Sequence, residues 1–340
     1  MSAYLNLPQR GIRASKLLLR TLSKNNLHPV TGENVVCPSQ IRDFEPKCVV
    51  PIVGGISVEY HDSSFHEFEY SQMRSISNFK DPGEYRDPTW FSIYEKPDVE
   101  HVKFTDLHMA RTHVDRSGYC LVTGAPDDSD QVIAEVQREC QMSMVESHFG
   151  DREYLQENNT RNKHNKQLGY TNSAIPLHTD LPFYEKPPAF QLLHCINPAD
   201  KGGANVIVNA LGTYRCMFSP VNRDCNAGYN ELKMTDIIFR RDQVDFFQQF
   251  ISPVISNAEA SDNTIVRVSP FSCVYPHDHV DFHRYMTFYC KYLRACYGMA
   301  RYIRLQKGQL LLYNNHRCLH GRTAFQGDRL MIGSYFESTV

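Results

Sequence analysis

Residues 169–180 carry the most informative pattern in the chain and read Gly-Tyr-Thr-Asn-Ser-Ala-Ile-Pro-Leu-His-Thr-Asp. The segment ends with an imidazole, His178, and a carboxylate, Asp180, with one residue between them. On an extended strand, residues i and i+2 point to the same side, so these side chains can present one nitrogen and one oxygen to a single point. Alone, this pattern does not establish a metal site, because His-x-Asp often occurs by chance.

A third candidate ligand lies far downstream, in residues 310–322, which read Leu-Leu-Leu-Tyr-Asn-Asn-His-Arg-Cys-Leu-His-Gly-Arg. An apolar strand there runs into a polar turn and delivers His320 just before a glycine, and Arg329 follows ahead of a strand-like run. Two histidines and one carboxylate can hold one face of an Fe(II) ion and leave the other positions open. A guanidinium beside them can grip the far carboxylate of a dicarboxylic cosubstrate. Taken singly, His320 is more simply interpreted as a core histidine and Arg329 as part of a surface ion pair. The occurrence of His-x-Asp, Leu-His-Gly-Arg and Arg329 in one chain favours an iron site.

At these residues the chain resembles the 2-oxoglutarate-dependent oxygenases of the taurine dioxygenase superfamily. It is most similar to the gamma-butyrobetaine and trimethyllysine hydroxylases, over roughly residues 102 to 336. The matching segments are Gly-Tyr-Cys-Leu-Val-Thr-Gly-Ala-Pro at 118–126, Leu-His-Thr-Asp at 177–180, Pro-Pro-Ala-Phe-Gln-Leu-Leu-His-Cys at 187–195, Gly-Gly at 202–203 and Leu-His-Gly-Arg at 319–322.

The resemblance implies a role for each polar residue of these motifs. Fe(II) would be held by His178, Asp180 and His320. Bound 2-oxoglutarate would pair with Arg329, with further polar contacts from Gln167 and Asn205. With O2, this 2-oxoglutarate-dependent dioxygenase would oxidise an unactivated C–H bond of a small molecule and release succinate and CO2.

The substrate is predicted from the residues that stand where the related hydroxylases box a quaternary ammonium with aromatic faces, a cation–π arrangement. The candidate substrate-binding residues are Tyr170, Tyr335, Phe149, Glu153 and Tyr154. Glu153 stands where the family has a tryptophan, with Tyr154 beside it. Because a primary or secondary ammonium can donate N–H to a carboxylate, we expect an amino-acid- or amine-derived acid.

Other interpretations of the site remain open from the sequence. The chain can be a gamma-butyrobetaine or trimethyllysine hydroxylase proper, or it can catalyse oxidative cyclisation or desaturation of a natural-product amino acid. The aromatic residues can also be ordinary core residues. A cupin-like binding protein and a zinc hydrolase could use the same ligands, but the position of Arg329 disfavours both.

The predicted fold is mainly β with flanking helices (α+β). The chain has 340 residues, 41% of them hydrophobic, which suffices for a full core. Many short strands with long insertions favour a jelly roll, and the resemblance implies a cupin-like double-stranded β-helix over residues 101–340. Helices are expected over residues 104–116, 127–150 and 276–298, a strand over 234–239, and a polar loop, either a lid over the site or a solvated insertion, over 151–167.

Residues 1–100 are expected to form a small irregular N-terminal region. The related hydroxylases often hold zinc there, but Cys37, Cys48, His61 and His66 are poorly spaced for a structural site, so we expect none. The acid-poor, basic start can be a helix or a transit peptide. We therefore expect a cytoplasmic protein, or a mitochondrial or plastid one if that segment is cleaved.

The net charge and the number of cysteines limit the kinds of partner that we expect. The net charge of −2 argues against nucleic acid or an anionic membrane, and no apolar run approaches the length of a spanning helix. The 11 cysteines are scattered and indicate reduced thiols. We expect a small-molecule substrate, and the resemblance allows a homodimer.

Overall fold

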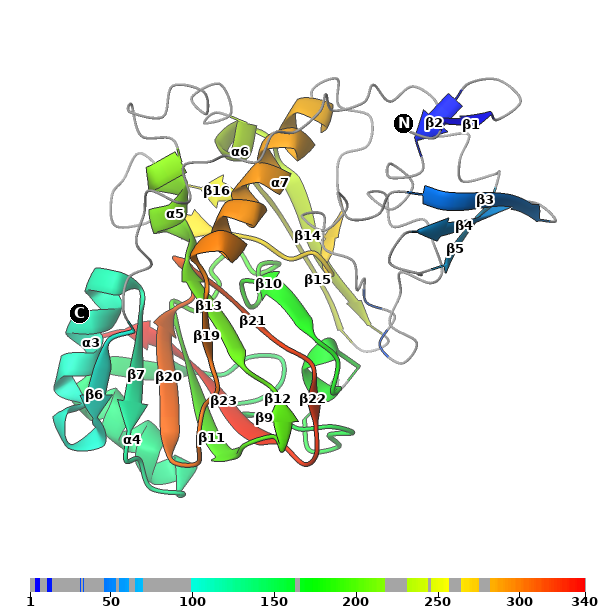
Figure 1. The fold of residues 1–340 in the computed structure, drawn as a ribbon. Helices are drawn as coiled ribbons and strands as arrows, with labels where there is room; N and C mark the ends of the chain where they lie inside the picture. The colour runs from blue at the N-terminus through cyan, green and yellow to red at the C-terminus, as the bar shows by residue number, and fades with distance from the viewer. Residues whose placement is uncertain are drawn as a thin grey trace.

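The core of the protein is a pair of facing β-sheets with helices on their outer sides (Figure 1). The computed structural model describes residues 4–6, 11–13, 31, 33, 46–52, 55–60, 65–69, 99–162, 166–217, 231–243, 246–256, 264–274 and 282–339. This architecture confirms the predicted mainly β fold with flanking helices.

The larger sheet has the strand order β6-β7-β20-β11-β23-β8, and β9 also pairs with β23. The β6–β7 pair is parallel and the others are antiparallel. The strands are β6 (His101–Lys103), β7 (Tyr119–Thr123), β8 (Met142–Val145), β9 (Glu153–Leu155), β11 (Phe190–Asn197), β20 (Gln309–Asn314) and β23 (Leu330–Ser338).

The smaller sheet carries the metal-ligand motifs and has the order β10-β21-β13-β19, all antiparallel. Its strands are β10 (Ile175–His178), β13 (Asn205–Asn209), β19 (Arg301–Ile303) and β21 (Cys318–Arg322). The strands β10 and β21, which are more than a hundred residues apart in the chain, therefore lie side by side.

Successive side chains of β20 point to opposite faces of the larger sheet and pack into two different hydrophobic clusters. Leu310 and Leu312 pack under the helices η5 (Phe104–Asp106), α3 (His108–Ser117) and α4 (Ser129–Glu139) on the outer face. Leu311 and Tyr313 point the other way, into the core between the sheets. Near-continuous apolar runs such as this suit strands that are buried on both faces.

The helix predicted over 127–150 is too long. Asp128 caps α4 by accepting the backbone N–H of Asp130 at 2.9 Å. The helix ends at Glu139, and Gln141 adopts a left-handed φ of 53°. The following residues join β8 at the sheet edge, because strand pairing with β23 overrides their helical spacing.

The outer side of the smaller sheet is covered by α5 (Ala210–Met217), α6 (Glu231–Met234) and α7 (Phe282–Met299). The predicted strand over 234–239 was placed too early, because it starts at Ile237 after α6 ends. The remaining strands are β12 (Lys201–Gly202), β14 (Ile237–Gln243), β15 (Phe246–Ser252), β16 (Ile255–Ser256), β17 (Ile265–Val266), β18 (Cys273–Val274) and β22 (Phe325–Gln326).

The N-terminal region, expected to be irregular, contains two small antiparallel sheets. They comprise β1 (Tyr4–Asn6) with β2 (Gly11–Arg13), and β3 (Pro46–Ile52), β4 (Gly55–Tyr60) and β5 (Phe65–Glu69). The side chains of Cys37, Cys48, His61 and His66, and most of the basic segment 1–32, lie outside the described residues.

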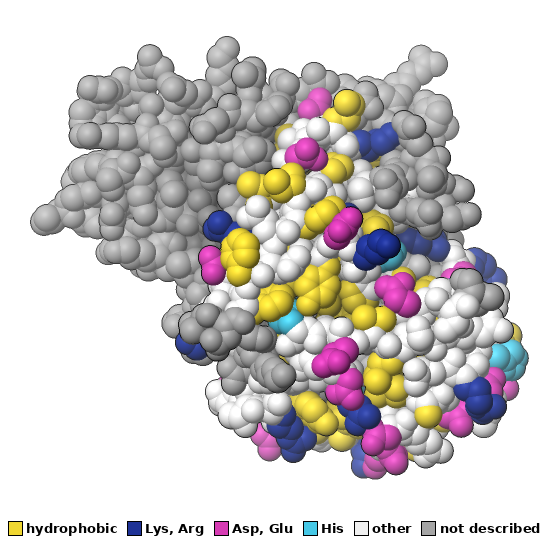
Figure 2. Space-filling view, turned by 180° about the vertical axis from the view of Figure 1, so that it is seen from behind, with side chains coloured by type: hydrophobic (Ala, Val, Ile, Leu, Met, Phe, Trp, Pro, Cys, Tyr) yellow, Lys and Arg dark blue, Asp and Glu magenta, His cyan; other side chains and the backbone are white. Residues whose placement is uncertain are grey.

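The surface carries both signs of charge. Figure 2 shows Lys and Arg interspersed with Asp and Glu over the described part of one face. Within the described ranges, no helix combines the length and the apolar character needed to cross a bilayer.

Candidate metal centre

Cross-strand pairing brings the two candidate imidazoles together. His178 at the end of β10 lies directly opposite His320 on β21, and their ring centroids are 4.2 Å apart. Asp180 follows just past β10, with its Oδ1 3.2 Å from His178 Nε2 and its Oδ2 3.7 Å from His320 Nε2. One ligand atom from each residue lies within 4.8 Å of the others.

Second contacts set which nitrogen each histidine offers. His178 Nδ1 donates to the carbonyl of Pro176 at 2.8 Å, which leaves Nε2 as the nitrogen that faces Asp180. Burial, together with the nearby His178, lowers the pKa of His320 to about 3, so its ring is neutral at physiological pH. Two imidazoles and one carboxylate fit a divalent metal such as Fe(II).

Asn315 fixes the backbone of Asp180. Its Oδ1 accepts the Asp180 N–H at 2.9 Å, and its Nδ2 donates to the Asp180 carbonyl at 3.1 Å and to the Pro188 carbonyl at 3.0 Å. The next residue, Leu181, takes a left-handed φ of 54°, which turns the chain away from the strand. Although burial opposes ionisation, the neighbouring histidines and the Tyr335 hydroxyl hold the pKa of Asp180 well below its usual range.

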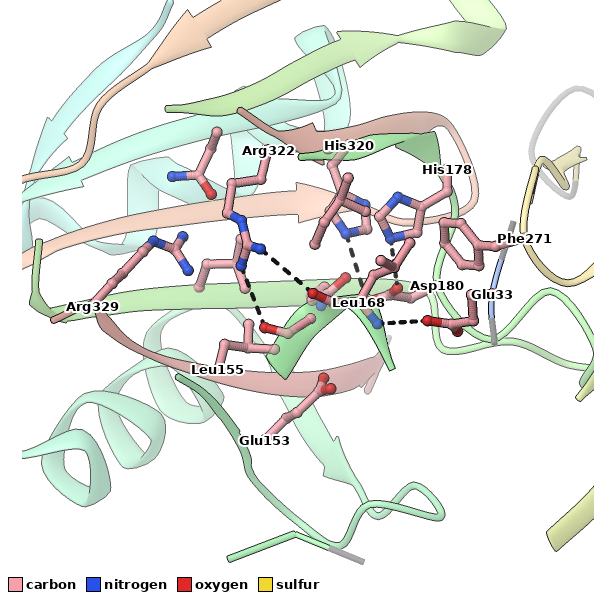
Figure 3. Close-up of a pocket in the computed structure, with 16 residues that line it drawn as sticks. Glu33, Glu153, Leu155, Leu168, His178, Asp180, Phe271, His320, Arg322 and Arg329 are labelled. Atoms are coloured by element: carbon pink, nitrogen blue, oxygen red, sulfur yellow. Dashed lines mark hydrogen bonds and ion pairs between the residues drawn. The ribbon is translucent and has the colours of Figure 1, made fainter. Parts of the chain in front are cut away.

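The three ligands form one wall of a pocket (Figure 3). The pocket is lined by Glu33, Glu153, Leu155, Leu168, Gly169, Ile175, His178, Asp180, Gln191, Leu193, Asn205, Phe271, His320, Gly321, Arg322 and Arg329. Besides its apolar members, the pocket has two guanidinium groups, two amides and two further carboxylates.

Arg329 lies apart from the metal ligands, just before β23 (Figure 3). Its side chain is 6% exposed, and no described residue makes a hydrogen bond or ion pair to its guanidinium. Burial lowers its pKa to about 10, so it still carries its charge at neutral pH. A buried guanidinium without a carboxylate partner is costly, and an anionic ligand in the pocket would remove that cost.

The second guanidinium in the pocket, that of Arg322, is already occupied. It donates to the carbonyls of Leu168, Gly169, Thr171 and Ser173, at 2.6 to 3.5 Å. These bonds tie the 168–173 segment to β21. Arg322 is thus a structural clamp on one side of the pocket, whereas Arg329 is available to a ligand.

Glu153 is a buried carboxylate of the pocket wall, 4% exposed, on β9. Its Oε1 accepts from Gln167 Nε2 and from the Tyr170 hydroxyl at 3.1 Å, and its Oε2 accepts from the Tyr335 hydroxyl at 3.2 Å. Burial, followed by the proximity of Asp180, raises the pKa of Glu153 to about 7. The Glu153 carboxyl in the pocket wall therefore changes between its neutral and charged forms near neutral pH.

Only some of the other predicted binding residues line the pocket. Asn205 lines the pocket, whereas Gln167, Tyr170 and Tyr335 surround Glu153 instead of lining it. Phe149 packs edge-on to Tyr170, and Tyr154 lies under the Arg161 guanidinium. The aromatic residues thus do not present an open cage of faces to the pocket.

Comparison with known proteins identifies the family. The family model described as taurine catabolism dioxygenase TauD, TfdA family matches residues 95–335. The chain belongs to this family.

Two named proteins are similar to this chain in sequence. Dioxygenase str8 of Strobilurus tenacellus is 25% identical over 329 residues, covering 88% of this chain and 74% of its own length. Gamma-butyrobetaine dioxygenase of Pseudomonas sp. (strain AK-1) is 30% identical over 177 residues, covering 49% of this chain and 44% of its own. This chain therefore spans less than half of the latter protein.

A solved structure of asparagine oxygenase, in complex with Fe(II), 2S,3S-3-hydroxyasparagine and succinate, shares the fold. It aligns with a TM-score of 0.53 and 14% identity, over 68% of this chain and 78% of that one. The likeness supports the double-stranded β-helix that the two facing sheets form.

Sequence reasoning gave no role to five polar or aromatic residues that line or support this site. Two had a detectable signal: Gln191 is a polar residue on an inward position of the apolar β11, and Arg322 lies two residues after His320 and so shares its strand face. Phe271, Asn315 and Glu33 had none, because each reaches the site through a loop or from a distant segment.

Proposed function

We propose that this TauD/TfdA-family protein is an Fe(II)- and 2-oxoglutarate-dependent oxygenase acting on a small amino-acid- or amine-derived acid. In the hydroxylation form of the reaction, substrate R–H, 2-oxoglutarate and O2 become R–OH, succinate and CO2. The observation that carries the proposal is one pocket that holds the convergent His178, Asp180 and His320 together with Arg329, whose guanidinium has no carboxylate partner among the described residues.

Different side chains of the pocket would bind the metal and the cosubstrate. His178, Asp180 and His320 would hold Fe(II), and Arg329 would pair with the far carboxylate of 2-oxoglutarate, with Asn205 beside it. When bound, this pair of groups supplies the oxidising power for an unactivated C–H bond. The protein contributes two imidazoles, a carboxylate whose backbone is fixed by Asn315, and apolar side chains of Leu155, Leu193 and Phe271 beside them.

Glu153 supports an ammonium-bearing substrate. A buried carboxylate on the pocket wall gains most from a cation that donates N–H directly to it. A quaternary ammonium, such as that of gamma-butyrobetaine, offers no N–H and prefers aromatic faces. Because the tyrosines here turn their hydroxyls to Glu153, the arrangement favours a primary or secondary amine over the alternative gamma-butyrobetaine or trimethyllysine hydroxylase.

The test is succinate formation from 2-oxoglutarate, measured with Fe(II) and a matched series of substrates. The series 4-aminobutyrate, its N-methyl and N,N-dimethyl forms and gamma-butyrobetaine replaces the N–H bonds one by one with N–CH3 while the charge and the carbon chain stay the same. Common α-amino acids are tested beside it. We expect stimulation by compounds with N–H and little by the quaternary member. Succinate formation stimulated by gamma-butyrobetaine alone would overturn the substrate proposal, and no succinate under any condition would overturn the oxygenase proposal. Product analysis by mass spectrometry separates hydroxylation from desaturation or cyclisation.

A further inference from the structure

Glu33 reaches the pocket from outside the segment that the family model matches. It lies in the N-terminal region, whereas the match covers residues 95–335. The residue is 8% exposed and lines the same pocket as the metal ligands (Figure 3). The N-terminal region therefore contributes a buried charge to the wall of the site.

Two directional contacts hold Glu33 in place. Its Oε2 accepts the backbone N–H of Leu168 at 2.5 Å, and its Oε1 forms an ion pair with Arg241 on β14. Both partners of the ion pair are buried, with side chains 8% and 9% exposed. Removing one partner of such a pair leaves an uncompensated buried charge, so each is needed to retain the other.

The contacts converge on the short segment that supports Glu153. Arg241 also donates to the Lys166 carbonyl at 3.0 Å, and Gln243 donates to the same carbonyl at 2.8 Å. This segment includes the 3-10 turn η6 (Leu168–Tyr170), which Arg322 holds from the other side through its carbonyls.

Gln167 and Tyr170 lie on either side of the Leu168 N–H that Glu33 binds. Both donate hydrogen bonds to the same oxygen of Glu153. A shift of the Leu168 amide would therefore move two of the three donors that orient the pocket acid. The contact with Asp180 through Tyr335 does not depend on this segment.

We propose that Glu33 is a positioning residue for substrate recognition: by pinning Leu168 and Arg241, it fixes Gln167 and Tyr170 against Glu153. The inference rests on the proposed function, in which Glu153 receives the substrate ammonium. It assigns to the N-terminal region a direct part in choosing the substrate, while the Fe(II) and 2-oxoglutarate contacts belong entirely to the matched domain.

The experiment compares Glu33→Gln with the native protein in the succinate assay. The amide keeps the shape and one acceptor but loses the ion pair, so we expect the KM for the best amine in the panel to rise about tenfold. The KM for the keto diacid cosubstrate should stay within about twofold, because the variant leaves Arg329 in place. Glu135→Gln, which removes an exposed ion pair with Arg138 on α4, is the matched control.

A second readout needs no substrate. Hydrogen exchange of the Leu168 amide should be faster in Glu33→Gln and unchanged in Glu135→Gln. If Glu33→Gln does not fold, Arg241→Lys keeps the charge while losing the second guanidinium donor, and it should give a smaller rise in the KM for the amine. Equal rises in the amine and cosubstrate KM values, or unchanged exchange at residues 166–170, would overturn the positioning role. Absence of succinate from the native protein would instead overturn the proposed function.

Discussion

Asp180 and Glu153 present their carboxylates to the same hydroxyl group. The Tyr335 oxygen lies 2.9 Å from Asp180 Oδ2 and 3.2 Å from Glu153 Oε2, so these two carboxylate oxygens are at most about 6 Å apart. The candidate metal ligand and the candidate substrate acid are thus one hydroxyl group apart. Because the hydroxyl has a single proton, it can donate fully to one carboxylate at a time.

This short separation predicts where the substrate is oxidised. An ammonium bound to Glu153 lies close to the metal wall, so the carbon facing the metal should be the one bearing nitrogen or its immediate neighbour. Mass spectrometry of products from site-specifically deuterated amines should show deuterium loss at these carbons. Loss confined to the far end of a long chain would contradict the assignment of Glu153.

The pH dependence of substrate binding should follow Glu153. Burial and Asp180 raise the pKa of its carboxyl to about 7, so the charged form that attracts an ammonium accumulates as the pH rises through that value. We expect the KM for the amine to fall between about pH 6 and pH 8, the range around this pKa. In Glu153→Gln, the KM for the amine should be about tenfold higher or more and flat over this range. Glu157→Gln, an exposed acid of the same segment, should keep the native profile.

The same carboxyl should lower the stability of the metal-free protein when it ionises. In the unfolded chain it ionises near its ordinary pKa of 4.5, but in the folded protein it keeps its proton up to about 7. The folded state therefore binds more protons between these values, and its stability falls as the pH rises through them. At pH 8, Glu153→Gln should be more stable than the native chain by about 3 kcal/mol, the equivalent of that pKa difference. Urea unfolding at pH 8 and at pH 4.5 measures this, and a constant difference would refute the linkage.

Arg329→Lys should impair the cosubstrate selectively. A lysine keeps the charge but loses the planar pair of donors that matches a carboxylate. We expect the KM for the cosubstrate to rise by about ten- to a hundredfold, with little change in the KM for the amine. Arg138→Lys on the exposed side of α4 serves as the control. A rise in the amine KM alone would mean that Arg329 binds the substrate instead.

The sequence predicted the residues whose spacing is set by strand geometry. His178 and Asp180 converge because of their i, i+2 spacing, and the apolar run at 309–313 forms the predicted strand, β20. It did not predict contacts made by tertiary pairing. Residues 151–167 looked like a polar loop, yet Glu153 pairs with Gly333 at the sheet edge and becomes buried.

The aromatic residues show a second limit of sequence reasoning. Their positions matched a cage for a quaternary ammonium, but a ring and its hydroxyl point in different directions. Glu153 draws the hydroxyls of Tyr170 and Tyr335 toward itself, because a buried carboxylate requires donors. The identity of a residue at a family position therefore did not determine which part of its side chain meets the ligand.

The most direct test of the metal centre is succinate production from 2-oxoglutarate by the native protein and by His320→Ala, each supplied with Fe(II) or with Zn(II). We predict succinate from the native protein with Fe(II), none with Zn(II), and none from His320→Ala with either metal. Succinate from His320→Ala at the native rate, or its absence from the native protein with Fe(II), would contradict the assignment of His178, Asp180 and His320 as the iron ligands.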